Sequence, residues 1–224
     1  MNSGRFANRQ AAGRALAKVL ASKSLVDQVV LALPRGGVAV AVEIAQALKA
    51  PLDIVLVRKI GVPWQPELAA AAVVDGGEPE IVTNDEVVEL AGVDRSYIDA
   101  AAKRELEEIE RRRRLYLQGR AGVPLKGRTI VLVDDGIATG ASIRAALHAL
   151  KRKAPKALIL AVPVAPANTV AFLRREVDDV ICLATPEPFL AIGVHYEDFH
   201  QMSDSEVIQF LAETRPPQPA NGIG

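Results

Sequence analysis

The feature that most constrains this chain is an apolar, β-branched run that ends in two acids and a loop of small residues. Residues 129–133 are TIVLV, and Asp134 and Asp135 follow them directly. An uninterrupted apolar run of this length is typical of a strand buried on both faces of a parallel sheet. The GIATGAS loop that follows and the helical spacing of residues 143–150 predict a strand–loop–helix unit. Such a unit favours an α/β fold.

A unit of this kind can bind an anion. Backbone N–H groups of a tight loop at a helix N-terminus point toward the anion, and the helix dipole adds roughly half a positive charge there. Thr139 and Ser142 add hydroxyl donors. Asp134 and Asp135 would repel a phosphate, so we expect them to accept hydrogen bonds from sugar hydroxyls. The unit therefore predicts a ribose 5-phosphate site, and a plain strand-to-helix turn with acidic capping residues is the alternative.

The run VLVDDGIATGAS closely resembles the signature with which type I phosphoribosyltransferases bind 5-phosphoribosyl 1-pyrophosphate (PRPP). It lacks the GK[ST] ending of a P-loop, and the chain has no G-x-G-x-x-G fingerprint. The resemblance implies that PRPP contacts Asp134, Asp135, Gly136, Ile137, Ala138, Thr139, Gly140, Ala141 and Ser142. It also implies Mg²⁺ as cofactor, bound mainly through PRPP, with no metal site built from protein ligands alone.

A second strand–loop–helix unit occurs earlier in the chain. A short apolar run over residues 28–33 leads into Arg35, Gly36 and Gly37, and helical spacing follows over residues 38–48. The glycines permit close approach of the backbone, and Arg35 offers a bidentate fork to phosphate oxygens. By itself Arg-Gly-Gly is about as often a plain turn as a binding site. In the family that the chain resembles, this position is the loop that holds the pyrophosphate of PRPP.

Two cations follow the next apolar run. Residues 52–57 predict a strand that places Arg58 and Lys59 at its carboxyl end. Ligands bind outside the carboxyl ends of strands in open α/β sheets, so both cations should face the same crevice as the two aspartates; a solvated strand end is the alternative. Residues 60–68 lack periodicity and resemble the mobile catalytic loop that phosphoribosyltransferases close over PRPP. The residues expected to carry catalysis are Asp134, Asp135, Lys59 and Arg35.

The remaining segments extend the alternation of strands and helices. Apolar runs over residues 157–164 and 180–183 flank a helical stretch over residues 169–176. With the earlier runs they predict a Rossmann-like open parallel sheet of about five strands flanked by helices, the type I phosphoribosyltransferase fold. Residues 84–119 predict a helical insertion that covers the site or carries a dimer contact. A homodimer is therefore one expected assembly.

The last third of the chain changes character. Residues 185–213 are irregular and rich in aromatic side chains, and they resemble part of the hood that selects the accepting base in this family; sealing of the sheet edge is the alternative. Residues 215–224 are Pro-rich and predict a disordered tail, which leaves a single domain over residues 1–214. Ala138 stands where members acting on hypoxanthine or guanine have an aspartate, which argues against an oxopurine acceptor.

Composition excludes several classes of protein. Lys plus Arg and Asp plus Glu number 27 each, so no net field favours a nucleic acid or a membrane as partner. The single Cys182 excludes an internal disulfide and a cysteine metal cluster. No apolar run is long enough to span a membrane, and we expect a cytoplasmic protein.

Together the patterns and the resemblance predict a phosphoribosyltransferase of nucleotide metabolism. It would transfer ribose 5-phosphate from PRPP to a nitrogen nucleophile, a nucleobase or a related acceptor, and release pyrophosphate. The two aspartates would oppose the positive charge that grows on the ribose ring, and Arg35 and Lys59 would neutralise the departing pyrophosphate. The alternative function is a PRPP sensor that keeps the binding site without catalysis.

Overall fold

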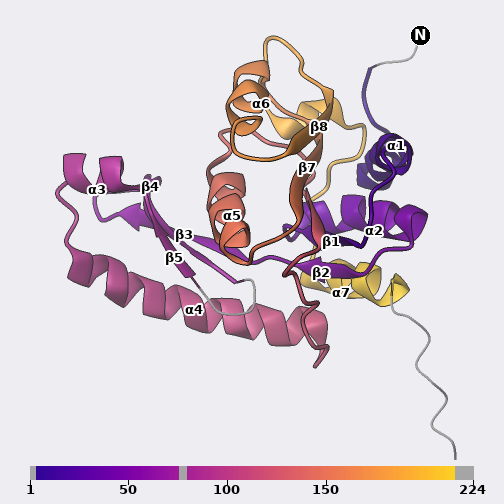
Figure 1. Ribbon diagram of the computed structural model, residues 1–224. Coiled ribbons are helices and arrows are strands. Elements are labelled where there is room, and N and C mark those ends of the chain that lie inside the picture. Colours follow the sequence, from indigo (N-terminus) through magenta and orange to yellow (C-terminus); the bar gives the residue numbers. More distant parts are fainter. Residues whose placement is uncertain (1–3, 76–79, 215–224) are drawn as a thin grey trace, which may run out of the picture.

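The main body of the molecule is a five-stranded parallel sheet (Figure 1). The computed structural model describes residues 4–75 and 80–214. The strand order is β2-β1-β6-β7-β8, and every neighbouring pair is parallel, which confirms the predicted open sheet. The strands are β1 (Gln28–Ala32), β2 (Leu52–Ile54), β6 (Thr129–Val133), β7 (Ala157–Val164) and β8 (Asp179–Ala184).

Helices cover both faces of this sheet, as a continuous apolar strand requires. Side chains on one face, such as Val30 and Val131, belong to the core that includes residues of α1, α2 and α7, whereas Leu31 and Leu132 on the other face belong to the core that includes α5 and α6. All five residues of β6 are buried. The helices are α1 (Arg9–Ala21), α2 (Gly36–Leu48), α5 (Ala141–Arg152), α6 (Ala167–Leu173) and α7 (Asp204–Glu213).

A second, antiparallel sheet and two helices form an arm that extends to one side of the main body (Figure 1). We use the name arm for residues 57–117. Its longest helix is α4, whose 23 residues give a length of about 35 Å and reach from the arm to α7. The elements of the arm are β3 (Val57–Val62), β4 (Gln65–Val74), β5 (Glu80–Thr83), α3 (Asp85–Leu90) and α4 (Arg95–Leu117).

The arm corrects two predictions. Residues 57–62 do not end the edge strand of the main sheet but form β3, so Arg58 and Lys59 lie inside a strand of the second sheet. The predicted loop over residues 60–68 is the tip of the β3–β4 hairpin. The strand pattern is hidden in the sequence because the register shifts on both sides of Gly61. A Cβ at Gly61 would collide with the Pro66 carbonyl, so this irregularity requires glycine.

Other predicted segments agree with the structure. Residues 84–119 are mainly helical, and residues 185–203 are irregular apart from one turn of 3₁₀ helix, η1 (Ile192–His195). The predicted disordered tail at residues 215–224 lies outside the described residues. No helix in the described ranges combines the length and the apolar character needed to cross a membrane.

Candidate functional site

The candidate site lies where the strand order of the main sheet reverses. Strands β1 and β6 are hydrogen-bonded neighbours, but their crossovers run to opposite edges of the sheet. At such a switch point the loops at the carboxyl ends of the two strands diverge and leave room for a ligand. The loop after β1 carries Arg35, Gly36 and Gly37, and the loop after β6 carries Asp134 and Asp135. The fold therefore brings together the two loops that the sequence predicted.

The glycines of the first loop are required by contact with the second. A Cβ at Gly37 would lie 2.8 Å from the carbonyl oxygen of Val133 and 3.0 Å from Cα of Asp134. A Cβ at Gly36 would collide with the carboxylate of Asp135. The first of these distances is shorter than real Cβ contacts show and the second is tighter than most of them, so a larger residue would separate the loops.

The loop after β6 ends at an uncapped helix N-terminus. Gly140 precedes α5 with φ of +77°, a left-handed conformation that favours glycine. No side chain forms a capping hydrogen bond there, so the first N–H groups of α5 have no side-chain acceptor. Ala138 and Thr139 are exposed, and Ile137 anchors the loop through its N–H to the carbonyl oxygen of Val164 at 2.9 Å. This geometry suits a bound phosphate.

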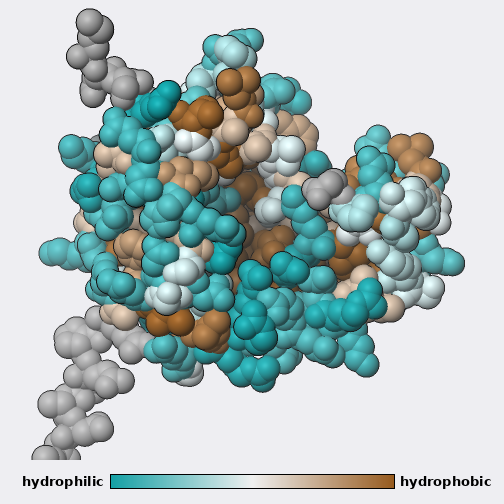
Figure 2. Space-filling model, turned by 180° about the vertical axis from the view of Figure 1, so that it is seen from behind, coloured by the Kyte–Doolittle hydropathy of each residue, from teal (hydrophilic) through white to brown (hydrophobic). Residues whose placement is uncertain are grey.

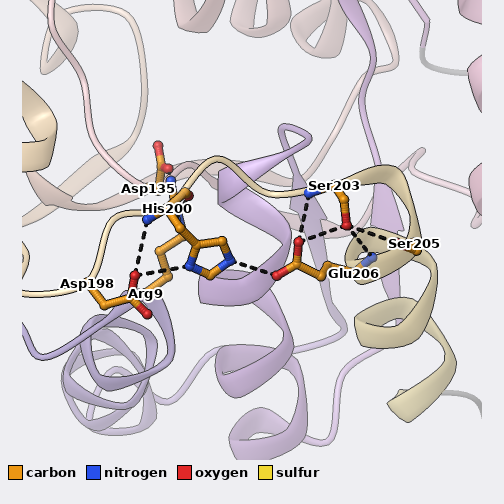
Figure 3. A network of polar contacts seen from close by, with 7 residues as sticks. All are labelled: Arg9, Asp135, Asp198, His200, Ser203, Ser205 and Glu206. Carbon is orange, nitrogen blue, oxygen red and sulfur yellow. Dashed lines mark hydrogen bonds and ion pairs between the residues drawn. The ribbon is translucent and has the colours of Figure 1, made fainter.

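Asp135 is held by an arginine that the motif did not predict (Figure 3). Arg9 Nε donates to Asp135 Oδ2 at 2.7 Å, and Arg9 Nη1 donates to the His200 carbonyl oxygen at 3.0 Å. The guanidinium lies 3.9 Å from the centroid of the Phe199 ring, and the Tyr196 hydroxyl donates to the Asp135 carbonyl oxygen at 2.6 Å. The Arg9 and Asp135 side chains are only 9% and 13% exposed. Water therefore does not solvate Asp135 as an open strand end would allow.

The sequence does contain a signal for Arg9. The buried face of α1 is otherwise apolar, with Ala12, Leu16 and Leu20 repeating at helical spacing, and Arg9 continues that face by one more turn. A charged side chain on a buried helical stripe needs a partner of opposite charge. The partner could not be named from the sequence because Asp135 lies 126 residues away.

The two carboxylates have different surroundings. Asp134 Oδ1 accepts the backbone N–H of Asp135 at 2.8 Å. Burial raises the pKa of Asp134 well above its ordinary value, and the neighbouring charge of Asp135 raises it further. Burial also raises the pKa of Asp135, but the hydrogen bond and the charge of Arg9 oppose that rise. Among the described residues, Asp134 has no cation that forms an ion pair with it, and it would gain from hydroxyl donors or a developing positive charge.

Arg35 contacts a second group that the sequence did not predict. Its Nη1 lies 3.8 Å from Asp204 Oδ1, which also accepts the hydroxyl of Tyr116 at 2.6 Å. Burial and the bond to Asp204 raise the pKa of Tyr116 to about 12, so the phenol stays protonated and keeps donating. The Arg35 side chain is one-third exposed, at 35%. Helices α4 and α7 thus support the first loop from behind, and its guanidinium remains accessible.

Arg58 and Lys59 do not face the same crevice. Successive side chains of a strand point to opposite faces of its sheet. Arg58 Nε pairs with Glu105 Oε2 of α4 at 2.6 Å, whereas Lys59 lines a cavity of about 240 Å³ between the arm and α5. Ala141, the first residue of α5, lines the same cavity. The structure therefore places Lys59 beside the helix that follows the aspartate loop, and it places Arg58 on the other face of the arm.

Comparison with known proteins decides the family. Residues 6–197 match the phosphoribosyl transferase domain. The chain belongs to this family. Proteins of Mycobacterium tuberculosis strains CDC 1551 and H37Rv, both named as candidate phosphoribosyl transferases, are each 47% identical to it over 206 residues. Those residues are 92% of this chain and 46% of each relative, so the chain spans about half the length of the curated relatives it matches.

A solved structure shares the architecture of this phosphoribosyl transferase chain. The crystal structure of TT1426 from Thermus thermophilus is 42% identical, covers 95% of this chain and 100% of its own, and has a TM-score of 0.83. Together with the five-stranded parallel sheet and its flanking helices, this similarity confirms the predicted α/β fold of the type I phosphoribosyltransferases.

The aromatic segment of the phosphoribosyl transferase domain has two parts. Tyr196 and Phe199 stack with ring centroids 4.9 Å apart and seal α1 against the end of β6. Phe189 instead lines a cavity of about 460 Å³ beyond the carboxyl ends of β7 and β8, and its ring lies 5.5 Å from that of His195. His195 Nε2 is buried with no hydrogen-bond partner among the described residues. Both parts pack against one hydrophobic cluster, and Phe189 also lines the cavity.

Seen from behind, the surface is hollowed between the main body and the arm, and hydrophobic residues lie in the hollow (Figure 2). On the arm side the tip of the β3–β4 hairpin carries Trp64, whose side chain is 67% exposed. The arm contacts α5 through β3, β4 and β5. The candidate site therefore has one closed side, formed by α1 and residues 196–204, and one open side, formed by the arm.

Proposed function

We propose that the protein transfers ribose 5-phosphate from PRPP to a nitrogen nucleophile and releases pyrophosphate. The observation that carries this proposal is the contact between the two loops at the switch point. Gly36 and Gly37 approach Asp135 and Asp134 so closely that no side chain fits between them. A loop with a phosphate-binding arginine thus adjoins a pair of carboxylates and a helix N-terminus, the three parts that a phosphorylated, pyrophosphorylated sugar needs.

Each part has a role in the proposed reaction. The 5-phosphate would bind the first turn of α5, with donors from Thr139, Gly140 and Ser142. The ribose hydroxyls would bind Asp134 and Asp135, and the same carboxylates would stabilise the oxocarbenium-like transition state. The departing pyrophosphate would bind Arg35 and the glycine loop, with Lys59 approaching from the arm. The accessible guanidinium of Arg35 and the exposed amine of Lys59 support these roles.

Magnesium is part of the proposal. Mg²⁺ prefers oxygen ligands and usually keeps several waters while it binds substrate phosphates. The described residues form no group of three or more side chains that could hold a metal ion by themselves. The proposed ion would bind mainly through PRPP and water, and it would offset the charge of the pyrophosphate leaving group.

The acceptor would lie next to the hood. The cavity lined by Phe189, with the buried Nε2 of His195 nearby, offers an aromatic ring and an unpaired polar atom of the kind that recognises a heterocycle. We infer a nucleobase or a related acceptor, and Ala138 argues against an oxopurine. Nucleotide metabolism, a cytoplasmic location and a homodimer belong to the same proposal.

A PRPP sensor is the second candidate function. It would need the two loops but not a cation on the leaving group. Lys59 favours the enzyme because it lines a cavity with α5 although it comes from a different sheet. Tight PRPP binding without turnover of any acceptor would favour the sensor.

Two measurements test the proposal. Calorimetry should show binding of PRPP and of ribose 5-phosphate, and magnesium should strengthen binding of PRPP. A screen of nucleobases with PRPP should then find at least one that releases pyrophosphate. Failure to bind either sugar phosphate would overturn both candidate functions, and binding without turnover of any base would leave the sensor.

A further inference from the structure

A large cavity lies on the α5 face of the main sheet, away from the candidate site. It measures about 670 Å³ and is lined by residues of β2, of the 122–126 loop, of α4 and of the C-terminal end of α5. We call it the basal pocket. Helix α5 begins at the phosphate-binding turn and ends at Arg152 in this pocket, and its 12 residues span about 18 Å. One small ligand therefore cannot occupy both places.

The pocket exists because no helix covers one corner of the sheet. Helices α5 and α6 pack over β6, β7 and β8, whereas Leu31 of β1 and Val55 after β2 face the pocket. The 122–126 loop closes this corner with Pro124 and Leu125 among its lining residues. The volume of the basal pocket lies within the range of about 300–1,000 Å³ that is typical of small-molecule sites, and the walls of the pocket are largely apolar.

Cations from three separate segments surround this apolar interior. Arg113 comes from α4, Lys126 from the loop before β6, and Arg152 and Lys153 from the end of α5. Glu80 lies 3.4 Å from both Arg152 and Lys153, which is longer than the usual 2.7–2.9 Å of a charge-assisted hydrogen bond. Lys126 is exposed, and none of the described acids pairs with it.

The acids that the structure describes near the pocket already have partners. Arg113 pairs with the buried Asp75 at 2.6 Å, and Glu80 is shared by two cations. Asp53 lies on the floor and accepts N–H groups of Ile54 and Val123, both at 2.8 Å. An ionised carboxylate has about four acceptor positions, so Asp53 can also accept a hydroxyl or amine of a ligand. Of the described cations that line the pocket, Lys126 therefore has no described acidic partner and is available to an anion.

We infer that the basal pocket binds a phosphate monoester with an apolar, hydroxyl-bearing body, and that a nucleoside monophosphate is the ligand class. The phosphate would lie against Lys126 and Arg152, the base against Leu31, Val55 and Pro124, and a ribose hydroxyl on Asp53. If the proposed function holds, its nucleotide product belongs to the same class. The binding site itself does not depend on that function.

The test uses adenosine 5′-monophosphate (AMP) and inorganic phosphate as probes, with the phosphate-binding turn blocked. Thr139→Asp adds a negative charge at an exposed position of that turn, and loss of ribose 5-phosphate binding would verify the block. AMP should still bind Thr139→Asp in calorimetry, more tightly than inorganic phosphate. Amide chemical shifts should change at Gly122 and Ala154 and stay unchanged at Gly140.

A second substitution in the blocked protein locates the phosphate. Lys126→Glu should weaken AMP binding at least tenfold, because a charge-assisted contact becomes a repulsion. Lys156→Glu makes the same charge change at an exposed lysine that does not line the pocket, and it should leave AMP affinity within about twofold.

Equal weakening of AMP binding by both substitutions, or no AMP binding to Thr139→Asp, would overturn the inference. Binding of phosphate as tight as AMP would overturn the ligand class. Thermal melting of each variant should match its parent.

Discussion

The two sides of the candidate site differ in how they hold their charged groups. On the closed side, the end of β6 is packed against α1 and residues 196–204, and the Arg9–Asp135 pair is about one-tenth exposed. On the open side, the arm presents Lys59 to solvent and ends in a Trp64 that is 67% exposed. A buried ion pair is tied to folding, whereas an exposed charge is not. Loss of the buried Arg9–Asp135 pair should therefore lower stability, whereas loss of Lys59 on the open side should lower turnover.

Arg9→Ala should give the largest effect on the closed side. It leaves the Asp135 carboxylate without its cation, and loss of one partner of a buried pair costs about 3 kcal/mol. For a chain of this length that corresponds to a fall in melting temperature of about 6–12 °C. Arg14→Ala is the matched control, because Arg14 lies on the same helix and pairs with Glu43 at 2.9 Å but is 57% exposed. Equal melting of both variants would refute the difference between the two sides.

The carboxylates can be separated by Asp134→Asn and Asp135→Asn. Asp134→Asn should lower turnover by about a hundredfold, or about 3 kcal/mol of transition-state stabilisation. It should melt at or above the wild type at neutral pH, because a carboxyl whose pKa is raised in the folded state destabilises that state when ionised. Asp135→Asn should lower both turnover and melting temperature, since Arg9 loses its partner.

The measurement for both is pyrophosphate release with the acceptor that the nucleobase screen identifies, together with a thermal melt. If Asp134→Asn melts well below the wild type, Asp134 has a structural partner that the raised pKa does not reveal. Full turnover in both variants would remove the proposed role of the pair.

The open side is tested by two neighbouring cations. Lys59→Ala should lower turnover roughly tenfold, equivalent to about 1.4 kcal/mol, while PRPP affinity and melting temperature change little. Arg58→Ala is the control, because Arg58 lies on the opposite face of β3 and pairs with Glu105. It should leave turnover unchanged and cost less than about 1 kcal/mol of stability. If Arg58→Ala is the more damaging to turnover, the arm faces the ligand with its other surface.

The smallest expected effect concerns His200 at the rim of the closed side. Its ring lies between Asp198 Oδ1 at 3.0 Å and Glu206 Oε1 at 2.7 Å (Figure 3). Hydrogen bonds to Glu206 and Asp198 raise the pKa of His200 above 6.5. The ion pairs thus stabilise the fold fully below the ordinary histidine pKa of about 6.5, and this stabilisation is lost as pH rises through the raised value.

Comparison of wild type with His200→Gln across pH checks this sign. The wild type should melt above the variant at roughly pH 6, and the two curves should converge by about pH 9. A difference that grows with pH would contradict the assigned ion pairs. Arg9 contacts the backbone carbonyl oxygen of residue 200, which the substitution retains. Glutamine is chosen because it keeps a polar side chain but cannot become charged.

The sequence predicts the main body far better than the arm, and the reason is burial. Strands such as β6 are covered on both faces, so their apolar runs are unbroken and their ends are marked by glycine or acids. In the arm, β3 has Arg58 and Lys59 side by side and its register shifts at Gly61, and alanine fills residues 69–72 of β4. What the pattern does not reveal is that residues 57–62 leave the main sheet and pair with β4 in a sheet of their own.

The candidate site divides in the same way. The residues of the two loops could be predicted because their chemistry is local: glycines, acids and hydroxyls follow one another in the chain. Arg9, Tyr116 and Asp204 could not, because each acts through a contact across a long stretch of chain, such as the 88 residues between Tyr116 and Asp204. Periodicity shows that a buried polar side chain needs a partner but does not identify it.

The Arg9–Asp135 pair also sets an order for assembly during synthesis. The groups that surround Asp135 come from the first helix and from residues 196–200, so the chain must be made almost to α7 before they can meet. Every strand of the main sheet precedes residues 196–200 in the chain. Since contacts between distant segments form late, the sheet can pack while its two acids still lack their cation. The capacity to bind a ligand would then arise last, when the closing segment brings α1 onto the end of β6.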